Sequence, residues 1–332
     1  MDKPIRIVGH GLAGCVLAMT FVRRGLPFKM VGCTLPGEAS MASSGLIAPI
    51  TGRRYVKAWR IDEFLSHAQG FYHWSEQILG GRYFFPVDIV RYLAHPEARI
   101  AYAKRLSDPE YEAYISAKTT DLLDELGKPY GILTGGYRLD TPGWIQSARQ
   151  YLISKGLLTV LDEPFNEPNP EEEHVIWATG TTYTATAPRI IPNKGESLII
   201  RVPEWKIKEI IKEEVFIIPL DEKNLYWVGS FYDPWPATVL RTDEGRERIL
   251  NCIKKVYHGP LEIVKHMAGV RPTVNDRRPL IGPFPGRPDE FIFNGMGTKG
   301  TSLAPYWAEQ LMLHISEGIT LSDEVWPSRY IP

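Results

Sequence analysis

The chain has 332 residues, of which 44% are hydrophobic and 23% are charged, as in an ordinary globular protein. A single hydrophobic core stops growing at about 250–300 residues, so this length predicts two domains. The 38 basic and 39 acidic residues give a net charge of −1, which disfavours a general nucleic-acid binder without excluding a local basic patch.

The first segment of the chain is predicted to fold as strand, helix and strand. Residues 5–8 and 28–31 are short apolar runs, and between residues 14 and 24 apolar side chains recur at helical spacing. A helix must carry the chain back between two parallel strands, so this order indicates a parallel sheet. The densest basic stretch follows at Arg53, Arg54, Lys57 and Arg60, and is interpreted as a solvated or phosphate-facing loop.

The middle of the chain has a different pattern. Segments 83–93, 196–202, 215–220 and 225–232 are rich in β-branched and aromatic residues, which is typical of strands. Helices are expected only near residues 96–127 and 243–258. This pattern predicts a mostly antiparallel sheet in a second domain.

Elements typical of nucleotide-binding folds return later in the chain. Residues 142–155 are predicted to form a helix with proline in its first turn, and residues 175–180 a buried strand that ends in a glycine turn. A strand at 291–293, a glycine-rich loop and a helix at 303–315 follow. The nucleotide-binding domain should therefore comprise residues 1–82, 138–192 and 264–332, and the substrate domain residues 83–137 and 193–263.

The cysteines and the hydropathy pattern bear on the cellular compartment. Cys15, Cys33 and Cys252 form no closely spaced pair, so neither a disulfide framework nor a metal site is expected. No apolar run approaches the roughly 18 residues that span a bilayer, so no membrane partner is expected. These features predict a cytoplasmic protein.

A glycine-rich motif stands between the first predicted strand and helix. Residues 9–14, Gly-His-Gly-Leu-Ala-Gly, match the pattern Gly-x-Gly-x-x-Gly. The motif follows a predicted strand and opens a predicted helix, which is the context in which it indicates nucleotide binding. Its glycines allow a tight turn, close backbone approach to a pyrophosphate and packing of the helix on the strand. The helix N-terminus offers free N–H groups to phosphates. The residues predicted to bind a nucleotide here are Gly9, Gly11, Leu12, Ala13 and Gly14.

One expected feature of such a site is missing. An acidic residue usually ends the second strand and binds the ribose hydroxyls, but Gly32 stands at that position. This disfavours a NAD site. We expect the ribose to be held in another way, by the backbone or by Thr34, and we expect Cys33 and Thr34 to contact the cofactor.

Five further segments extend the pattern over nearly the whole chain. They are residues 39–49 (ASMASSGLIAP), 174–180 (HVIWATG), 192–196 (PNKGE), 268–283 (AGVRPTVNDRRPLIGP) and 294–305 (NGMGTKGTSLAP). In this order and spacing they resemble the FAD-dependent D-amino acid oxidase and glycine oxidase superfamily. The C-terminal motifs are most similar to the FAD domain of the bifunctional enzyme that forms methylaminomethyl-uridine in tRNA, whereas the flavin loop at 39–44 is less similar to that branch.

The resemblance implies an α/β fold, with a Rossmann-like FAD-binding domain and an inserted substrate domain of mostly antiparallel β-sheet plus helices. It implies FAD as the cofactor. Covalent attachment through the cysteine of sarcosine-oxidase-like members is excluded, because Gly269 stands at that position. Beyond the phosphate loop, the implied cofactor-binding residues are Ser43, Ser44, Gly45, Ala178, Thr179, Gly180, Arg271, Gly295, Gly297, Thr298, Lys299, Gly300 and Thr301.

Two of these residues are also predicted to act in catalysis. In glycine oxidase-like members the residue that matches Arg271 binds the substrate carboxylate, a task that suits a planar guanidinium. The alternative is that Arg271 braces the loop through backbone carbonyls. Lys299 is expected to place positive charge at the pyrimidine edge of the flavin or to assist oxygen activation, with an ordinary surface lysine as the alternative.

The pocket wall is less well defined by the sequence. Phe216 stands where the family has a tyrosine that binds the substrate carboxylate. Tyr226, Tyr232 and Trp235 are candidates for the wall, with core packing as the alternative.

The resemblance implies an FAD-dependent amine or amino-acid oxidoreductase, either an oxidase or a dehydrogenase. It would oxidise the C–N bond of a small amine substrate by hydride transfer to flavin N5, with molecular oxygen or another electron acceptor as partner. One alternative is FAD-dependent demodification of a carboxymethylaminomethyl-uridine in tRNA, a partner that the net charge does not favour. The other is a catalytically inactive FAD-binding protein.

Overall fold

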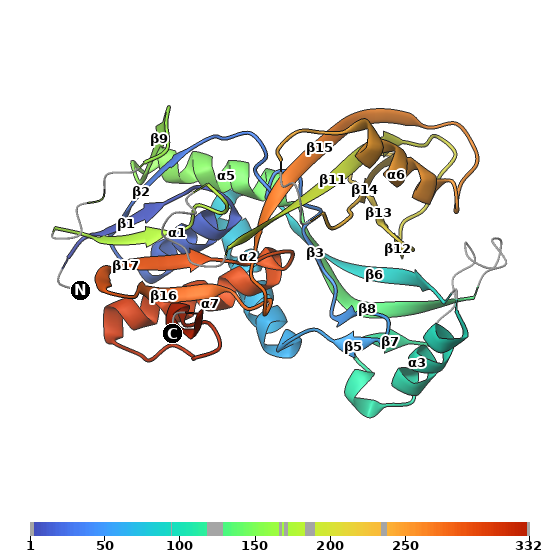
Figure 1. Ribbon diagram of the computed structural model, residues 1–332, viewed down its shortest axis with the longest axis horizontal. Coiled ribbons are helices and arrows are strands. Elements are labelled where there is room, and N and C mark those ends of the chain that lie inside the picture. The colour runs from blue at the N-terminus through green and yellow to red at the C-terminus, as the bar shows by residue number, and fades with distance from the viewer. Residues whose placement is uncertain are drawn as a thin grey trace.

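Two β-sheets organise the chain, and each forms the centre of one lobe (Figure 1). The structure, a computed structural model, describes residues 3–93, 95–117, 129–165, 168, 172–182, 190–233 and 238–330. The first sheet has six strands in the order β16-β17-β10-β1-β2-β9. These are β1 (Ile5–Val8), β2 (Lys29–Cys33), β9 (Leu158–Leu161), β10 (His174–Trp177), β16 (Leu280–Phe284) and β17 (Arg287–Asn294). All neighbours pair in parallel except β16 and β17.

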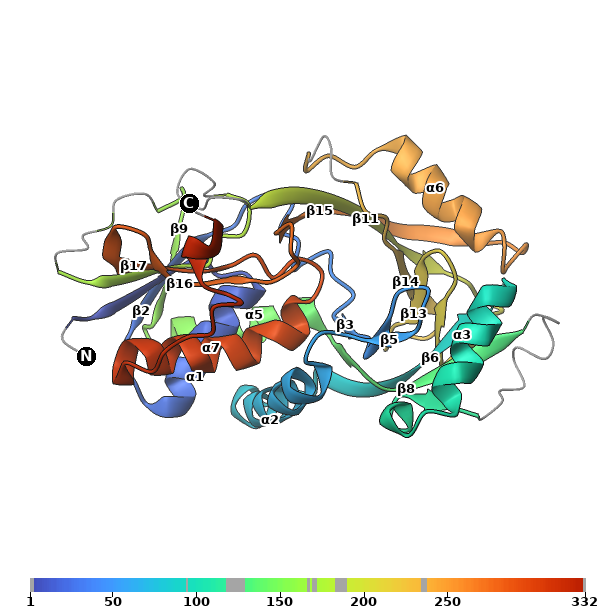
Figure 2. The same cartoon turned by 60° about the horizontal axis from the view of Figure 1, so that its bottom comes forward.

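Helices cover this sheet and pack on one another (Figure 2). They are α1 (Leu12–Arg24), α5 (Thr141–Ser154) and α7 (Gly300–Glu317). Helix α2 (Ile61–Leu79) packs on α7 and α5 and reaches β6 (Phe84–Tyr92) of the second sheet. Helix α1 is buried from Gly14 to Phe21, because it lies between the sheet and helices α5 and α7. Its N-terminus, which follows the turn after β1, therefore has a fixed position at the carboxyl edge of the parallel strands.

The second sheet follows the order β15-β11-β14-β13-β12-β6-β8-β3, with β7 paired to β8. Its pairs are antiparallel except β12 with β6. The strands are β3 (Leu46–Ile47), β6 (Phe84–Tyr92), β7 (Ile115–Ser116), β8 (Tyr130–Leu139), β11 (Ile191–Arg201), β12 (Ile210–Lys212), β13 (Phe216–Pro219), β14 (Leu225–Gly229) and β15 (Glu262–Thr273).

Smaller elements complete the two lobes. Helices α3 (Pro96–Leu106) and α6 (Asp243–Ile253) belong to the lobe of the second sheet, and β4 (Ile50–Thr51) pairs with β5 (Val56–Lys57). Two 3-10 turns lie at Pro109–Tyr111 and Pro327–Tyr330. In the part of the chain that the structure describes, no helix is both long and apolar enough to cross a membrane.

The predicted fold class is confirmed, since a parallel Rossmann-like sheet and a mostly antiparallel sheet are both present. The domain boundaries stay a proposal. The boundary at residue 264 falls inside β15, which pairs along its whole length with β11 of the second sheet. The boundary after residue 137 likewise falls inside β8.

Helix α2 was not predicted, although its buried residues recur at helical spacing and acidic residues occupy its first turn. Of the helix predicted near residues 96–127, the structure has α3, which ends at Leu106. Residues 118–128 of the predicted helix lie outside the described part of the chain.

The interpretation of the basic stretch as a solvated loop is wrong for Arg60. Its guanidinium lies over the rings of Trp59, Phe64, Tyr306 and Trp307, at 5.0–5.7 Å from their centroids. It also donates hydrogen bonds to Glu63, Glu324 and the Tyr306 hydroxyl. Arg53 and Arg54 are exposed, as expected. Nothing in the sequence indicated that α7, about 240 residues further along the chain, packs beside Arg60.

Candidate functional site

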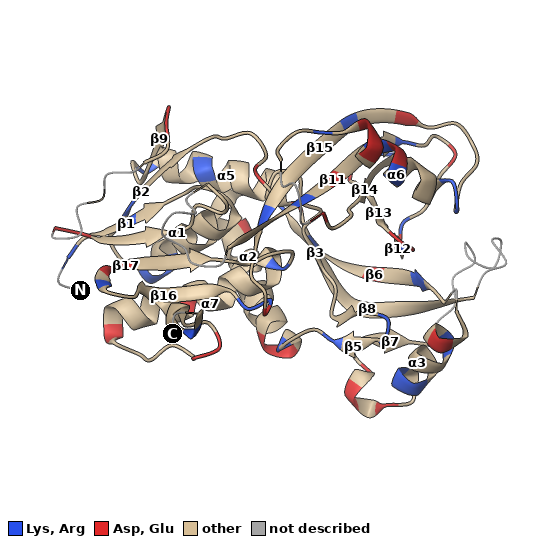
Figure 3. Ribbon diagram, in the orientation of Figure 1, with Lys and Arg blue, Asp and Glu red and all other residues tan. Residues whose placement is uncertain are grey.

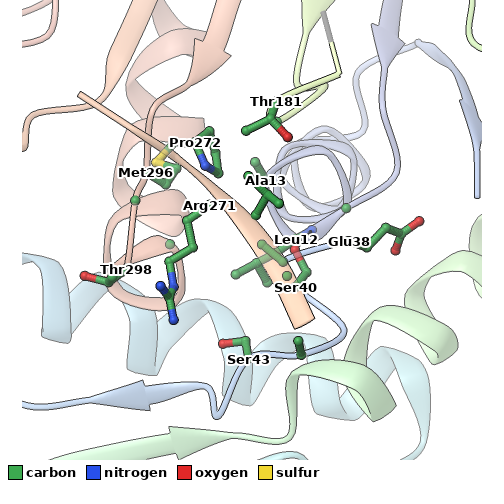
Figure 4. A pocket seen from close by; sticks show the side chains of 18 of the residues that line it. Leu12, Ala13, Glu38, Ser40, Ser43, Thr181, Arg271, Pro272, Met296 and Thr298 are labelled. Atoms are coloured by element: carbon green, nitrogen blue, oxygen red, sulfur yellow. Dashed lines mark hydrogen bonds between the residues drawn. The ribbon is translucent and has the colours of Figure 1, made fainter. Parts of the chain in front are cut away.

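A cavity of 520 Å³ lies where the two lobes meet (Figure 4). Its wall includes the turn between β1 and α1, the loop after β2, the end of β10 and the loop before α7, all from the lobe of the parallel sheet. Strands β11, β13, β14 and β15 contribute from the other lobe. The volume is in the range of about 300–1,000 Å³ that is usual for cofactor and ligand sites.

The phosphate loop has the geometry that its glycines predicted. Gly9 has a φ of 104°, and a Cβ added there would lie 2.5 Å from the carbonyl oxygen of Ala178. Gly14 lies inside α1, where an added Cβ would meet the carbonyl oxygen of Gly9. Gly11 precedes α1 and has no side chain to cap it, and the Ser40 hydroxyl accepts a hydrogen bond from the Leu12 N–H at 3.1 Å. The partial positive charge of this helix N-terminus lies at the cavity.

Most of the predicted cofactor-binding residues come together in this cavity. Its wall contains Gly9, Gly11, Leu12, Ala13, Cys33, Ser43, Ser44, Ala178, Thr179, Gly180, Arg271, Gly297, Thr298, Lys299, Gly300 and Thr301. Four predicted residues are not part of the wall. Gly14 is inside α1, Gly45 packs on the end of β8, Gly295 faces Val274, and Thr34 is exposed.

Arg271, on β15, places its guanidinium at the wall of the cavity. Its Nη1 donates to Asn193 Oδ1 at 3.2 Å and, at 3.4–3.5 Å, to the carbonyls of Lys194 and Phe231. Its Nη2 donates to the Ser230 hydroxyl. Burial lowers the pKa of Arg271, and no carboxylate of the described residues forms an ion pair with it. Arg271 therefore hydrogen-bonds to backbone carbonyls, as the alternative interpretation of this residue expected. Its positive charge beside the cavity also has no carboxylate partner among the described residues.

Lys299 immediately precedes α7 and is half-buried in the wall of the same cavity. Burial lowers the pKa of Lys299, and the neighbouring charges of Arg277 and Arg278 lower it further. Helix α7 begins without a side-chain cap, so its N-terminus adds partial positive charge at this end of the cavity. Together these features suit a group that gains negative charge during the reaction.

The aromatic candidates differ in their location. Phe216 and Trp227 line the cavity, and the Trp227 indole N–H donates to the carbonyl of Ala42 at 3.2 Å. Tyr226 instead packs in the core against Trp205, to whose carbonyl it donates a hydrogen bond. Tyr232 is 56% exposed and is not part of the wall. Trp235 lies outside the described residues.

The sequence interpretation missed a charged cluster at the end of the cavity near β2. It consists of His10, Glu38 and Arg149, and the first two residues line the cavity. Figure 4 shows Glu38 on one side of Leu12 and Ser40, with Arg271 and Thr298 on the other. An acidic residue shortly after Gly32 was a visible signal, but only the tertiary structure places it at the cavity.

The cavity fits an elongated anionic cofactor with a diphosphate. The N-termini of helices α1 and α7 both lie at its wall. The small residues of the loops in the wall let a ligand approach the backbone closely. Both ring nitrogens of the buried His10 lack a hydrogen-bond partner among the described residues. Polar atoms buried in this way require a partner, and a ligand in the cavity is in a position to supply one.

Comparison with known proteins agrees with this geometry. Residues 5–312 match the family described as FAD dependent oxidoreductase. The chain is 25% identical over 356 residues to the tRNA 5-methylaminomethyl-2-thiouridine biosynthesis bifunctional protein MnmC of Marinobacter nauticus, with 93% of this chain and 54% of that protein covered. The chain thus spans about half the length of this curated relative.

Solved structures share the fold at low sequence identity. Glycine oxidase from Geobacillus kaustophilus has a TM-score of 0.80 at 15% identity, with 99% of both chains covered. Iminodiacetate oxidase from Chelativorans sp. BNC1 has a TM-score of 0.74 at 17% identity, with 94% of this chain and 95% of that chain covered. With nearly the whole length matched by the family, this chain belongs to the FAD-dependent oxidoreductases of the D-amino acid oxidase type, and its cofactor is FAD.

Proposed function

We propose that this oxidoreductase oxidises the C–N bond of a small amine or amino acid that carries a carboxylate. The observation that supports this proposal is the half-buried guanidinium of Arg271, which lines the cavity without a carboxylate partner among the described residues. A cation that is partly withdrawn from water is stabilised by an anion. A substrate carboxylate is an anion of suitable shape for the guanidinium.

FAD, when bound, supplies the capacity to accept a hydride from the substrate carbon. The chain itself positions the substrate and excludes water. Arg271 holds the carboxylate, while Phe216 and Trp227 form an apolar wall beside it. Phe216 offers no hydroxyl to the substrate, so the carboxylate depends more heavily on Arg271 than in members that have tyrosine at this position.

The amine must lose its proton before oxidation, and the site favours the neutral form electrostatically. Both Arg271 and Lys299 are cations at the cavity, and like charges lower the pKa of a bound ammonium group. Among the described residues of the wall, the only carboxylate and imidazole are those of Glu38 and His10. Figure 4 places Glu38 on the far side of Leu12 from Arg271, and His10 lies beside Glu38. We therefore assign no general base and attribute deprotonation to the cationic, desolvated pocket.

The test is anaerobic titration of the purified holoenzyme, followed by the visible spectrum of the flavin. Glycine, sarcosine, iminodiacetate, proline, D-amino acids and an amine without a carboxylate form the panel. We expect a compound that carries both an amine and a carboxylate to bleach the flavin band, and the amine without a carboxylate to fail. Bleaching by the simple amine alone would contradict the proposal.

A second candidate function rests on the 25% identity to the tRNA-modifying relative, which extends over 93% of this chain. It would be an oxidation of a carboxymethylaminomethyl-uridine in tRNA, whose carboxylate also suits Arg271. Figure 3 shows basic and acidic residues interspersed over both lobes, so the view offers no basic stripe for an RNA backbone. Bleaching by tRNA that carries this nucleoside, and not by the small amino acids, would select this candidate. A flavin that none of these compounds reduces would indicate an inactive FAD-binding protein.

A further inference from the structure

Gly32, the residue at which an acidic side chain usually binds ribose, has no space for any side chain. A Cβ added to Gly32 would lie 2.8 Å from Cγ and 3.0 Å from Cβ of His10. The imidazole of His10 thus covers the end of β2, where the acidic residue of related folds would stand. Whatever binds the adenosine ribose here must come from another part of the chain.

His10 is buried, with 3% of its surface exposed, and it lines the cavity. Neither of its ring nitrogens has a hydrogen-bond partner among the described residues. Leaving buried polar atoms unpaired is costly, so a ligand group that hydrogen-bonds to this imidazole is expected in the cavity.

Glu38 lies beside His10, and one of its two oxygens accepts no hydrogen bond within the part of the chain that the structure describes. Its Oε2 accepts a hydrogen bond from Arg149 Nη2 at 2.9 Å, whereas its Oε1 lies 3.6 Å from His10 Nε2, beyond hydrogen-bond length. Burial raises the pKa of Glu38, but the contacts with His10 and Arg149 outweigh burial and hold it below its usual range. The ionised carboxylate is an acceptor only, which suits two hydroxyl donors.

The surrounding backbone fixes this carboxylate in place. Arg149, on α5, also donates from Nε to the carbonyl of His10 at 2.9 Å, so one guanidinium holds both members of the pair. The loop that carries Glu38 is anchored to β15, where the Val270 N–H donates to the Gly37 carbonyl. Figure 4 places Glu38 across the N-terminus of α1 from Arg271, at the end of the cavity opposite the proposed substrate site.

From this arrangement we infer that Glu38 and His10 bind the ribose hydroxyls of the adenosine half of FAD, in place of the acidic residue that β2 lacks. Arg149 is the positioning residue of this subsite. The loop after β2 thus supplies the carboxylate that the strand itself usually carries, and Gly32 is required because His10 occupies the space above it.

The experiment measures dissociation constants of the FAD-free protein, with flavin fluorescence as the signal. The ligands are FAD, FMN, and FAD analogues whose adenosine lacks the 2′- or the 3′-hydroxyl. We expect the unmodified protein to bind at least one deoxy analogue about 10-fold or more weakly than FAD, since a hydrogen bond to a charged group is lost. If the unmodified protein binds FAD and both analogues with equal affinity, the inference is overturned, and no variant is needed to show it.

Substitutions then locate the contact. Glu38→Gln should weaken FAD binding by a similar factor, leave FMN binding unchanged, and remove the discrimination against the deoxy analogue. Arg149→Lys should reduce this discrimination partially. The matched control is Glu97→Gln, because Glu97 is an exposed glutamate of α3 outside the cavity wall, and it should behave like the unmodified protein.

Two outcomes would contradict the assignment of Glu38. One is that Glu38→Gln weakens FMN and FAD equally, which would indicate a structural role. The other is that Thr34→Val, and not Glu38→Gln, removes the discrimination between FAD and the deoxy analogue.

Discussion

At the scale of single residues, the site depends on close approaches between side chains and glycines. Arg271 and Gly195 lie on the neighbouring strands β15 and β11, and a Cβ added to Gly195 would lie 2.1 Å from Arg271 Nη2. The guanidinium therefore has its position because β11 has no side chain there. This relation gives two ways to disturb the proposed carboxylate site, through Arg271 itself or through Gly195 on the neighbouring strand β11.

Replacing Arg271 by Leu should raise the KM for an amino-acid substrate on the order of 100-fold while FAD stays bound, because the charged hydrogen bonds to the carboxylate are lost. Arg271→Lys should recover part of this loss. Steady-state kinetics together with the flavin spectrum of the purified variants measure both effects. An unchanged KM in Arg271→Leu would refute the role of Arg271 in substrate binding.

Gly195→Ala tests the same site without removing a charge. The added methyl group has to displace the guanidinium, so we expect the KM to rise by about 10-fold, less than in Arg271→Leu. The matched control is Gly70→Ala in α2, where an added Cβ meets no atom within 4 Å. Equal kinetics in the two alanine variants would show that the position of Arg271 does not depend on Gly195.

At the scale of elements, one carboxylate joins a helix to two strands of the second sheet. Glu196 on β11 accepts hydrogen bonds from Lys194 at 2.7 Å, His266 of β15 at 2.7 Å, and the backbone and hydroxyl of Thr242, which caps α6. Burial raises the pKa of Glu196, but these contacts outweigh burial and leave it below its usual range. Such a depressed pKa means that ionised Glu196 stabilises the folded state.

Glu196→Gln should therefore lower the free energy of unfolding by about 3 kcal/mol near pH 7, since it also leaves Lys194 buried without its ion pair. Because the folded-state pKa is depressed, this stabilisation is present above the pKa of the unfolded chain and is lost as the pH falls through the folded-state pKa. Urea unfolding as a function of pH measures the difference between the two proteins. A difference that is constant down to acid pH would contradict the electrostatic origin.

The elements themselves could be predicted where their signals are local. β1, α1, β2, β6, α5, β10 and α7 were located from apolar runs, helical spacing and glycine turns, with ends within a few residues. Helix α2 and the strands β8, β9, β12, β15 and β16 are among the elements that were not predicted. The predicted strands of the middle segment gave no indication of which neighbours they would pair with, because pairing depends on residues distant in the sequence.

At the scale of the whole molecule, both lobes contribute to the wall of the cavity in which we propose that FAD binds. A ligand that binds the folded state and not the unfolded chain stabilises it by mass action. We therefore expect removal of FAD to lower the melting temperature, and added FAD to restore it with increasing concentration. At about 1,000 times the dissociation constant the stabilisation should approach roughly 4 kcal/mol. Differential scanning calorimetry measures it, and a melting temperature independent of FAD would contradict this site.

The sequence by itself determined the cofactor class and many residues of the cavity wall, because the phosphate loop follows a local strand–turn–helix pattern and the other glycine-rich segments resemble those of a known family. Only the tertiary structure decided the rest. The contacts of Glu38 with His10 and Arg149, and the position of Arg271 over Gly195, join segments far apart in sequence. Such contacts form only when the sheets and helices pack, so no local pattern encodes them.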